Sequence, residues 1–403
     1  MARTRTRRLR RAGGLTAVAT AVVFSAITLP AHAAPEGTIL GAGAPGSVSG
    51  SYLVTLKGGT EAPSAAGKGL AEKYGAKISH TYGTALNGYA VEANERQARL
   101  LAADPRVASV AQDTRVTLDS SSRTERNPPS WSLDRLDQPG LPLDKSYTSP
   151  DSGGSGVTVY VIDTGIRITH KDFGGRASYG RDFVDDDITA QDGNGHGTHV
   201  AGTIAGTTYG VAKKARVVAV RVLDNAGAGT TSQVIAGIDW VTQHAHKPAV
   251  ANLSLGGHHN AQLDAAVRNS IASGVTYTVA AGNDGLSAGL YSPADVKEAI
   301  TVGATDRSDA RAVFSNLGPA VDLFAPGVSI TSATYTSDTA KATFSGTSMA
   351  SPHAAGAAAV YLGAHPRATP AQVSRALVAG AVSGKVSGEG LGSPDKLLQV
   401  PRS

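Results

Sequence analysis

Apolar segments of strand length alternate with segments of helical length through most of the chain. From Trp131 onward, the strand-like apolar runs occupy residues 157–162, 217–222, 250–255, 275–280 and 300–302. The helical segments occupy residues 196–205, 231–244, 262–273, a stretch beginning near 348 and a stretch over 370–378. Continuous apolar strands separated by helices are typical of a parallel sheet that helices cover on both sides. The pattern therefore predicts an α/β domain with a doubly wound parallel sheet.

A shorter domain with a different order of elements precedes this one. Strand patterns occupy residues 52–56, 76–82, 88–91 and 107–117, and helical patterns occupy residues 65–74 and 95–103. Asn94 is a suitable N-cap for the second helix, and Glu95 and Arg99 are spaced for an i, i+4 ion pair. The order β-α-β-β-α-β predicts a small ferredoxin-like α+β domain.

The first 33 residues have the features of a secretory signal peptide. Arginines precede an apolar stretch from Leu15 to Leu29, and Ala31-His32-Ala33 fits an A-x-A cleavage site. A membrane anchor is the alternative, but the stretch is too short to span a bilayer comfortably and no basic residues follow it. Residues 34–50 are rich in Gly, Ala, Pro and Ser and are interpreted as a linker. The sequence thus predicts a secreted, extracellular protein.

Charge and cysteine content narrow the functional classes. The net charge of +5 suggests nucleic-acid binding, but six arginines lie before residue 12, and without them the net charge is −1. Because this basic surplus belongs to the segment expected to be removed, nucleic-acid binding is excluded. No later run is apolar enough to cross a membrane. The chain contains no cysteine, so packing or bound metal ions must stabilise the exported fold.

Four short motifs place candidate catalytic residues at the ends of predicted elements. They are Asp163 in V-T-V-Y-V-I-D-T-G, His196 in D-G-N-G-H-G-T-H-V-A-G, Asn283 in A-A-G-N-D-G, and Ser348 in F-S-G-T-S-M-A-S-P-H. A serine hydroxyl becomes a good nucleophile only where a base, an orienting acid and an oxyanion site converge on it. The sequence supplies a candidate for each role, which predicts acyl-transfer chemistry.

Taken alone, three of these motifs have other interpretations. Asp-Thr-Gly after an apolar strand also occurs in aspartic proteases, although these need two copies or a dimer, and no second copy follows a strand here. His196 and His199 are spaced i, i+3 and could bind a metal, but a zinc site would want a third ligand. Asn283 could merely tolerate a left-handed backbone in a glycine turn. The serine motif lacks the G-x-S-x-G elbow of esterases, which argues against that class of enzyme. It also gives the other three motifs a common interpretation as parts of one catalytic site.

The four motifs, in the order Asp, His, Ser, resemble those of the subtilisin-like serine endopeptidases and most closely the proteinase K and aqualysin branch. The resemblance implies that Ser348 is the nucleophile, His196 the general base and Asp163 the group that orients the imidazole. Asn283 would donate to the oxyanion together with the Ser348 N–H. It also implies that residues 121–403 form a subtilisin-like peptidase domain.

Residues 51–120 resemble the inhibitory propeptides of the same family, including the strand L-N-G-Y-A-V at 86–91. Such a propeptide acts as chaperone and as intramolecular inhibitor, with its tail near residues 116–120 lying in the cleft like a product. The polar segment 121–129 is the expected cleavage zone. The resemblance places the mature N-terminus within a few residues of Thr124.

The same resemblance implies the substrate-binding residues. Ser254-Leu255-Gly256 resembles the strand that pairs with the substrate backbone, and Gly227 resembles the facing edge. Main-chain pairing predicts broad cleavage because it does not depend on side chains. Ala280-Ala281-Gly282 would wall the S1 pocket with small residues, leaving room for apolar or aromatic side chains. Without the resemblance, residues 254–257 would be a buried strand end followed by a turn.

Calcium is the expected structural ion, and no cofactor is expected for the chemistry. Five oxygen-bearing residues have the spacing of a calcium loop in aqualysin-like relatives: Asp134, Asp137, Gln138, Asp144 and Ser146. The alternative is an ordinary polar surface. Asp322 resembles a second calcium ligand, which carbonyls of Lys297 and Ala299 would complete. Asp185-Asp186-Asp187 and His258-His259 are interpreted as solvated loops.

These features together predict a secreted, self-processing, monomeric serine endopeptidase. Its expected partners are protein and peptide substrates and its own propeptide, with no nucleic acid and no membrane. A catalytically dead homologue that serves as a binding module is the main alternative. Such a homologue would normally have lost a triad residue, and none is missing here.

Overall fold

The computed structural model describes residues 36–117, 121–122 and 130–401, and the structural statements below refer to these residues. The predicted signal peptide, the predicted mature N-terminus near Thr124 and most of the predicted cleavage zone lie outside the described residues. None of the described helices combines the length and the apolarity needed to cross a bilayer. Glu36–Ser403 form one compact unit.

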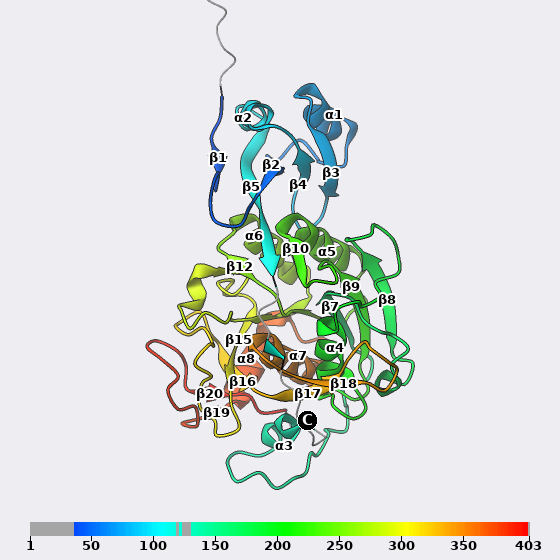
Figure 1. Ribbon diagram of the computed structural model, residues 1–403, viewed down its shortest axis with the longest axis vertical. Coiled ribbons are helices and arrows are strands. Elements are labelled where there is room, and N and C mark those ends of the chain that lie inside the picture. The colour runs from blue at the N-terminus through cyan, green and yellow to red at the C-terminus, as the bar shows by residue number, and fades with distance from the viewer. Residues whose placement is uncertain (1–35, 118–120, 123–129, 402–403) are drawn as a thin grey trace, which may run out of the picture. The chain divides into compact units, whose positions relative to one another are not determined.

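The small domain has the predicted β-α-β-β-α-β order (Figure 1). Its main strands are β2 (Ser47–Leu56), β3 (Lys77–Tyr82), β4 (Gly88–Glu92) and β5 (Val107–Thr117), in the spatial order β5-β2-β4-β3. Its helices are α1 (Ala65–Lys73) and α2 (Glu95–Ala102). Asn94 caps α2 in a capping box with Gln97, and Arg99 pairs with Glu95 at 2.6 Å. The predicted fold, cap and ion pair are confirmed.

The interpretation of residues 34–50 as a linker is partly wrong. β1 (Ile39–Leu40) pairs in parallel with β5, and β2 begins at Ser47 instead of Tyr52. Ile39 is buried in the core of the small domain. Main-chain pairing does not require an apolar pattern, so the Gly- and Ser-rich composition did not reveal these strands.

The large domain is built on a nine-stranded sheet in the order β19-β20-β16-β15-β13-β11-β7-β9-β8. All neighbours pair in parallel except β19 with β20. The strands are β7 (Thr158–Asp163), β8 (Ala177–Asp182), β9 (Arg216–Arg221), β11 (Ala249–Leu253), β13 (Thr276–Ala280), β15 (Ile300–Thr305), β16 (Leu323–Pro326), β19 (Val382–Ser383) and β20 (Lys396–Leu397). From β7 the chain first builds β8 and β9 on one side and then β11 onward on the other. The order therefore reverses beside β7.

Smaller elements surround this sheet. β12 (Gly257–His258) pairs with β14 (Tyr291–Ser292), and β18 (Lys341–Ser345) lies between β17 (Ile330–Ala333) and β6 (Ser121–Ser122). The remaining short elements are β10 (Ala228–Thr230), helix α3 (Trp131–Leu136) and the 3₁₀ turns Lys171–Phe173 and Ala288–Leu290.

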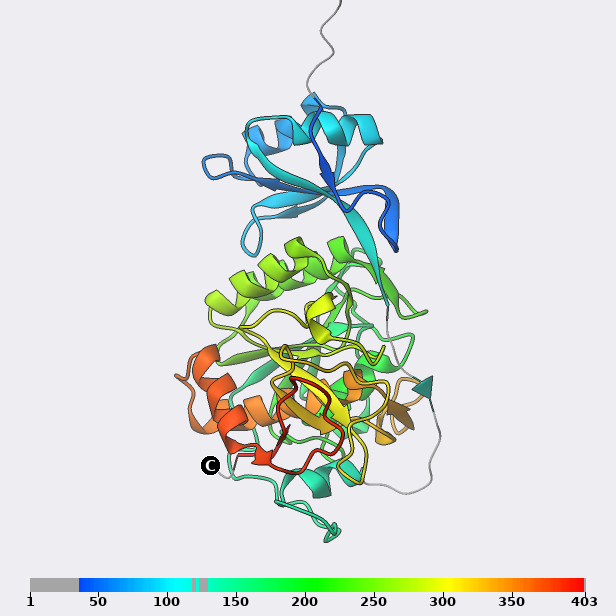
Figure 2. The same ribbon diagram turned by 90° about the vertical axis from the view of Figure 1, so that its left-hand side faces the viewer.

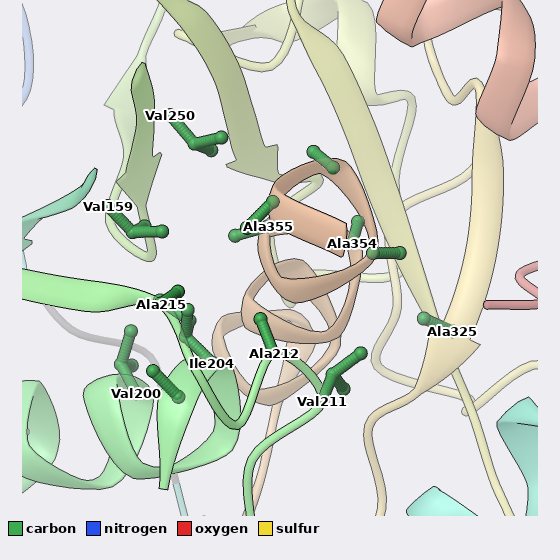
Figure 3. Packing of buried hydrophobic residues seen from close by; sticks show 14 of the residues in the cluster. Val159, Val200, Ile204, Val211, Ala212, Ala215, Val250, Ala325, Ala354 and Ala355 are labelled. Atoms are coloured by element: carbon green, nitrogen blue, oxygen red, sulfur yellow. The ribbon is translucent and has the colours of Figure 1, made fainter. Parts of the chain in front are cut away.

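Helices cover both faces of the sheet, as predicted (Figure 2). One face carries α4 (His196–Ala205), α7 (Thr347–Ala364) and α8 (Pro370–Gly380), and the other carries α5 (Thr231–His244) and α6 (Ala261–Ala272). Along β7, Val159 and Val161 join the first core, whereas Tyr160 and Ile162 join the second. In Figure 3, Val159 lies among residues of α4 and α7 in the first core. This alternation explains why residues 159–162 of the strand are all apolar.

Helix α7 is buried along most of its length and contains Pro352. A proline has no N–H, so the carbonyl of Ser348, four residues earlier, cannot accept the usual helical hydrogen bond. Ser254 Oγ donates to that carbonyl at 2.8 Å instead. The residue that follows β11 therefore compensates for the proline and fixes the backbone of Ser348.

Candidate active site

Asp163 is the last residue of β7, at the carboxyl edge of the sheet and beside the point where the strand order reverses. Ligands of open α/β sheets bind at such an edge. The Asp163 carboxylate is fully buried, and its Oδ1 accepts hydrogen bonds from Thr164 N–H at 2.7 Å and from His196 Nδ1 at 2.8 Å. Its position suits a group that orients an imidazole and stabilises it when protonated.

His196 is the first residue of α4, and small or acidic neighbours fix its position. Gly195 has a φ of 109°, and a Cβ on Gly197 would lie 2.1 Å from the carbonyl oxygen of Gly165. Glycine is therefore required at both positions. Asp192 Oδ1 accepts a hydrogen bond from Gly195 N–H at 2.8 Å, just before the helix. These requirements explain the Gly- and Asp-rich motif around the histidine.

The tautomer of the neutral His196 ring follows from its partner. The Asp163 carboxylate accepts from Nδ1, which leaves the lone pair of the neutral ring on Nε2. Nε2 is buried and has no hydrogen-bond partner among the described residues. An imidazole in this state is ready to accept a proton.

Ser348 lies in the first turn of α7, and the residue is 2% exposed. Its Oγ donates to the carbonyl oxygen of Ser254 at 3.0 Å. The hydrogen bond from Ser348 to His196 that the triad hypothesis implies is therefore not formed in this structure. The helices that carry the two residues, α4 and α7, do pack in one core (Figure 3).

Asn283 follows β13 in a turn where Gly282 has a φ of 99°. Asn283 itself has no left-handed backbone, so the alternative that it merely tolerates such a conformation is wrong. Its Oδ1 accepts hydrogen bonds from Thr347 N–H at 2.8 Å and from Thr347 Oγ1 at 2.9 Å. Because both contacts are to the oxygen, the orientation of the amide is fixed beside the residue that precedes Ser348.

A cleft next to Ser348 is lined by small residues and by the tail of the small domain. Its lining includes the predicted residues Leu255, Gly256, Ala281 and Gly282, together with Ala280, Asn283, Thr347, Ser348 and Thr117. β5 of the small domain enters here as an extended strand (Figure 1). It pairs antiparallel with β10, and Thr117 forms a bridge with Gly256.

Two substrate-binding predictions need correction. The edge that pairs with the tail is β10, and Gly227 lies in the turn before it with a φ of 75°. Gly227 therefore shapes the edge without forming it. Ser254 is fully buried, and its hydroxyl and carbonyl both contact Ser348, so it positions the serine and does not line the cleft in the described part of the chain.

Comparison with known proteins agrees with this geometry. Residues 154–395 match the subtilase family model, and residues 51–119 match the peptidase inhibitor I9 model. An extracellular serine proteinase of Thermus sp. (strain Rt41A) is 47% identical over 96% of this chain and 99% of its own length. The chain belongs to the subtilase family.

Further relatives support the same assignment. Alkaline serine exoprotease A of Vibrio alginolyticus is 48% identical over 81% of this chain, but the match spans only 60% of that protein. The crystal structure of a cold adapted subtilisin-like serine proteinase is 52% identical, with a TM-score of 0.66, and the match covers 68% of this chain and 98% of that one. The subtilase described here is thus a subtilisin-like serine proteinase with an I9 propeptide domain.

The propeptide domain of this subtilase contacts helix α5 through two buried carboxylates. Asp239 in α5 accepts hydrogen bonds from the backbone N–H groups of Thr84 at 2.8 Å and Ala85 at 2.6 Å. Asp113 in β5 accepts from Ser232 N–H at 3.2 Å and from Ser232 Oγ at 2.7 Å, in the first turn of α5. At the N-terminus of α5, the free N–H groups and the helix dipole favour the negative charge of Asp113. Neither contact could be inferred from the sequence.

The predicted calcium-loop residues fall into two groups. Asp137, Gln138, Asp144 and Ser146 line one hollow, together with Asp151, which the sequence analysis missed. Asp134 does not line this hollow; its oxygens accept hydrogen bonds from Asp144 N–H at 3.2 Å and Lys145 N–H at 2.8 Å. It therefore holds the loop backbone. The hollow offers carboxylate, amide and hydroxyl oxygens, a donor set that fits Ca²⁺.

A buried ion pair anchors this loop to the rest of the subtilase. Arg135 is 1% exposed and binds Asp309 in bidentate fashion, with N–O distances of 2.7 and 3.0 Å. Its remaining terminal nitrogen donates to the carbonyl oxygen of Gln138 at 2.7 Å. The loop is thus fixed from the inside, while its oxygen atoms line the hollow.

Asp322, the second candidate calcium ligand, precedes β16. Burial raises the pKa of Asp322 to about 6, and Oδ2 accepts a hydrogen bond from Thr301 N–H at 2.8 Å. Thr301 follows the predicted carbonyl donors Lys297 and Ala299 closely in the chain. A partly desolvated carboxylate of this kind fits a cation ligand.

The remaining polar candidates have defined roles in the structure. His199 is buried against Phe344, its Nε2 lies 2.9 Å from the carbonyl oxygen of Ile330, and burial lowers its pKa to about 3. It is a neutral core residue and no metal ligand. In the loop 185–187, Asp185 pairs with Arg221 at 2.6 Å and Asp186 pairs with Arg181. That loop is exposed, as predicted, and its carboxylates form ion pairs at the surface.

Proposed function

We propose that this subtilase is a secreted serine endopeptidase that releases its own propeptide domain and then cleaves proteins with broad specificity. The observation that carries the proposal is the buried Asp163–His196 pair, whose Nε2 has no hydrogen-bond partner in the described chain. The fixed amide of Asn283 and the cleft beside Ser348 support it.

In the reaction that we infer, Ser348 Oγ leaves the Ser254 carbonyl, transfers its proton to His196 Nε2 and attacks the scissile carbonyl carbon. Asp163 stabilises the imidazolium. The oxyanion accepts hydrogen bonds from Asn283 Nδ2 and the Ser348 N–H. The His196 proton then passes to the leaving amine as the C–N bond breaks, which leaves an acyl-serine. Water next gives a proton to His196 and attacks the acyl carbon. Ser348 Oγ finally leaves that carbon and takes the proton back from His196.

Broad specificity is supported by the way the propeptide tail is held. Residues 115–117 pair with β10, and Thr117 also bridges to Gly256, so an extended segment lies between two backbone edges. These contacts involve main-chain atoms, so a peptide of almost any sequence can form them. We infer that substrates bind in the same manner, with side-chain preference left to the cleft walls around Ala281 and Gly282.

Casein hydrolysis in the presence of a serine-directed fluorophosphonate tests the proposed function. Activity should disappear, and mass spectrometry should find one adduct, on the peptide that contains Ser348. An inhibitor of aspartic proteases should have no effect. Full hydrolysis by a chain labelled on Ser348 would refute the proposed nucleophile.

We further propose that the propeptide domain inhibits the mature enzyme, and that Asp239 is a main contact. Replacing Asp239 with alanine in the peptidase domain should weaken inhibition by separately added propeptide, because three backbone N–H groups lose a buried carboxylate partner. Truncating one partner of such a contact costs about 2–5 kcal/mol, so the inhibition constant should rise roughly 30-fold or more. The measurement is the inhibition constant with a peptide substrate. Arg268→Ala, on α6, is the matched control, and an equal effect of both variants would argue against the assignment.

Structural calcium is part of the proposal. Asp137, Gln138, Asp144, Ser146 and Asp151 would hold one ion, and Asp322 a second. Removing calcium with EDTA should lower the melting temperature by roughly 5–10 °C, given about 2.7 kcal/mol of binding stabilisation at a hundredfold excess over Kd. Initial activity should change much less. An Asp144→Asn variant should lose much of this calcium dependence, and an EDTA-insensitive melting temperature of the wild type would contradict both sites.

Secretion and the monomeric state complete the proposal. The supporting observations are the arginine-rich start, the apolar stretch and the A-x-A site of the first 33 residues. The extracellular relative from Thermus sp. is consistent with the same location.

A further inference from the structure

Three metal-binding side chains converge at the beginning of α6, away from the residues assigned to catalysis and calcium. They are His259, Asp264 and Asp295, and one potential ligand atom of each lies within 4.8 Å of those of the other two. His259 precedes the N-cap of α6, Asp264 lies in its first turn, and Asp295 follows β14. Such a group occurs once in the part of the chain that the structure describes. The interpretation of His259 as a solvated loop residue is therefore incomplete.

The distances within this cluster are those of ligands around a small ion. His259 Nδ1 lies 2.9 Å from Asp295 Oδ2 and 3.5 Å from Asp264 Oδ2. Ligands of a tetrahedral ion with metal–ligand bonds of about 2.0–2.1 Å are separated from one another by about 3.3 Å. The observed separations lie on either side of this value, so little movement would be needed to bind an ion.

The backbone holds the ligand residues in place. The N–H of His259 donates to the carbonyl oxygen of Leu290 at 3.1 Å, and the N–H of Asp295 donates to that of Tyr291 at 3.0 Å. Two of the three ligands are thus tied to the same short segment around β14. Asp264 is carried by a helix that Asn260 caps with hydrogen bonds to Gln262 N–H and Leu263 N–H.

One oxygen atom of each carboxylate is buried without a hydrogen-bond partner in the described chain. These atoms are Oδ1 of Asp264, whose side chain is 2% exposed, and Oδ1 of Asp295. In the described chain, His259 is the only ion-pair partner of either carboxylate. One exposed imidazole therefore compensates only part of the negative charge of the two adjacent carboxylates.

We propose that His259, Asp264 and Asp295 bind a divalent transition metal ion, with Zn²⁺ as the best-suited member of the class. A neutral imidazole and two carboxylates balance a charge of +2. An imidazole nitrogen is an ordinary ligand of Zn²⁺, whereas Ca²⁺ takes six to eight oxygen ligands. The side chain of His259 is 58% exposed, which leaves an open face for water as a fourth ligand.

The position of this site gives the ion a structural role. His259 follows β12, which follows Gly256 at the edge that bridges to the propeptide tail. β12 pairs with β14, the strand that precedes Asp295. A bound ion would link the β12–α6 connection to the segment after β14 and so stiffen the support of one cleft edge.

Zinc titration of the full-length Ser348→Ala chain tests the proposal without interference from autolysis. The chain is first saturated with Ca²⁺, and isothermal titration calorimetry and thermal melting are then followed with ZnCl₂. One Zn²⁺ should bind per chain, and the melting temperature should rise by roughly 5 °C at a hundredfold excess over Kd. His259→Ala and Asp295→Asn should each weaken binding by about 100-fold or more, since loss of an outer-shell partner alone costs 10–100-fold, and each should abolish the thermal shift.

His258→Ala is the matched control, because it removes the adjacent imidazole, whose ring stacks on Tyr291 outside the cluster. This variant should bind zinc like the parent chain. The two test variants change a mostly exposed side chain and a partly buried one, and their melting temperatures without zinc report whether they fold. Equal zinc affinity in the parent and both test variants would overturn the proposal. The absence of zinc binding by the parent chain would overturn it as well. A proton shared between the two carboxyl groups would then explain the cluster.

Discussion

Replacing Ser348 with alanine is expected to yield a chain that keeps its propeptide domain. The junction after β5 should be the first substrate of the enzyme, because the end of this strand already pairs with β10 and bridges to Gly256 beside Ser348. Loss of the nucleophile in subtilisin lowers kcat by about 10⁶, and we take this magnitude over from that enzyme. Intact-mass spectrometry after expression in a host without other secreted proteases measures the outcome.

Two controls separate a chemical defect from a folding defect. Ser345→Ala, which removes a hydroxyl three residues earlier, should mature like the wild type. Adding a trace of active wild-type enzyme to the Ser348→Ala chain should release the propeptide domain, since the junction remains cleavable in trans. A mature-sized product from the Ser348→Ala chain alone would show that another group or another protease performs the cleavage.

The core of the fold could be predicted from the sequence because its strands are buried on both faces. Val159 and Val161 pack under α4 and α7 while Tyr160 and Ile162 pack under α5 and α6, so the whole run is apolar. Helices with strong start signals were predicted equally well. Asn94 is an example, because capping is a local interaction between residues three positions apart.

Two of the strands that escaped prediction, β10 and β8, carry little hydrophobic signal. β10 consists of Ala228-Gly229-Thr230, and β8 (A-S-Y-G-R-D) is an edge strand with mostly half-exposed side chains. Their pairing depends on main-chain hydrogen bonds and on the neighbouring strand, neither of which is visible in a single segment. For the same reason the facing edge of the cleft was assigned to Gly227, one residue before the strand that forms it.

The catalytic residues could be identified because each motif also satisfies a local structural need. Gly195 and Gly197 around His196 are required by backbone geometry, and Pro352 after Ser348 requires an outside donor for the Ser348 carbonyl. What the motifs do not contain are contacts between distant segments. The Asp239 contact with the propeptide domain joins residues more than 150 positions apart, and the pair of His259 and Asp295 joins two loops that the sequence separates. Only the folded chain brings these groups together.

Replacing Asn283 with leucine is expected to lower kcat by about 10²–10³ and to leave KM almost unchanged, a magnitude taken from the corresponding loss measured in subtilisin. Leucine keeps the size of the side chain but removes the amide that we assign to the oxyanion. It also removes the acceptor of two hydrogen bonds from Thr347, so part of the loss could come from a displaced α7. Steady-state kinetics with a peptide substrate measures both constants.

Thr347→Val separates positioning of the amide from its chemistry. Valine removes the hydroxyl that donates to Asn283 Oδ1 and that accepts a hydrogen bond from Gly282 N–H at 3.1 Å, but the Thr347 N–H still holds the Asn283 oxygen at 2.8 Å. Only one of the two lost hydrogen bonds is to Asn283, and such a bond is worth about 0.5–1.5 kcal/mol, so kcat should fall about tenfold or less. A group that acts only on the transition state must lower kcat and kcat/KM together. If Asn283→Leu instead raised KM at constant kcat, or lowered kcat no further than Thr347→Val, the amide would bind the ground state or position α7, and the oxyanion would have to be stabilised by backbone N–H groups alone.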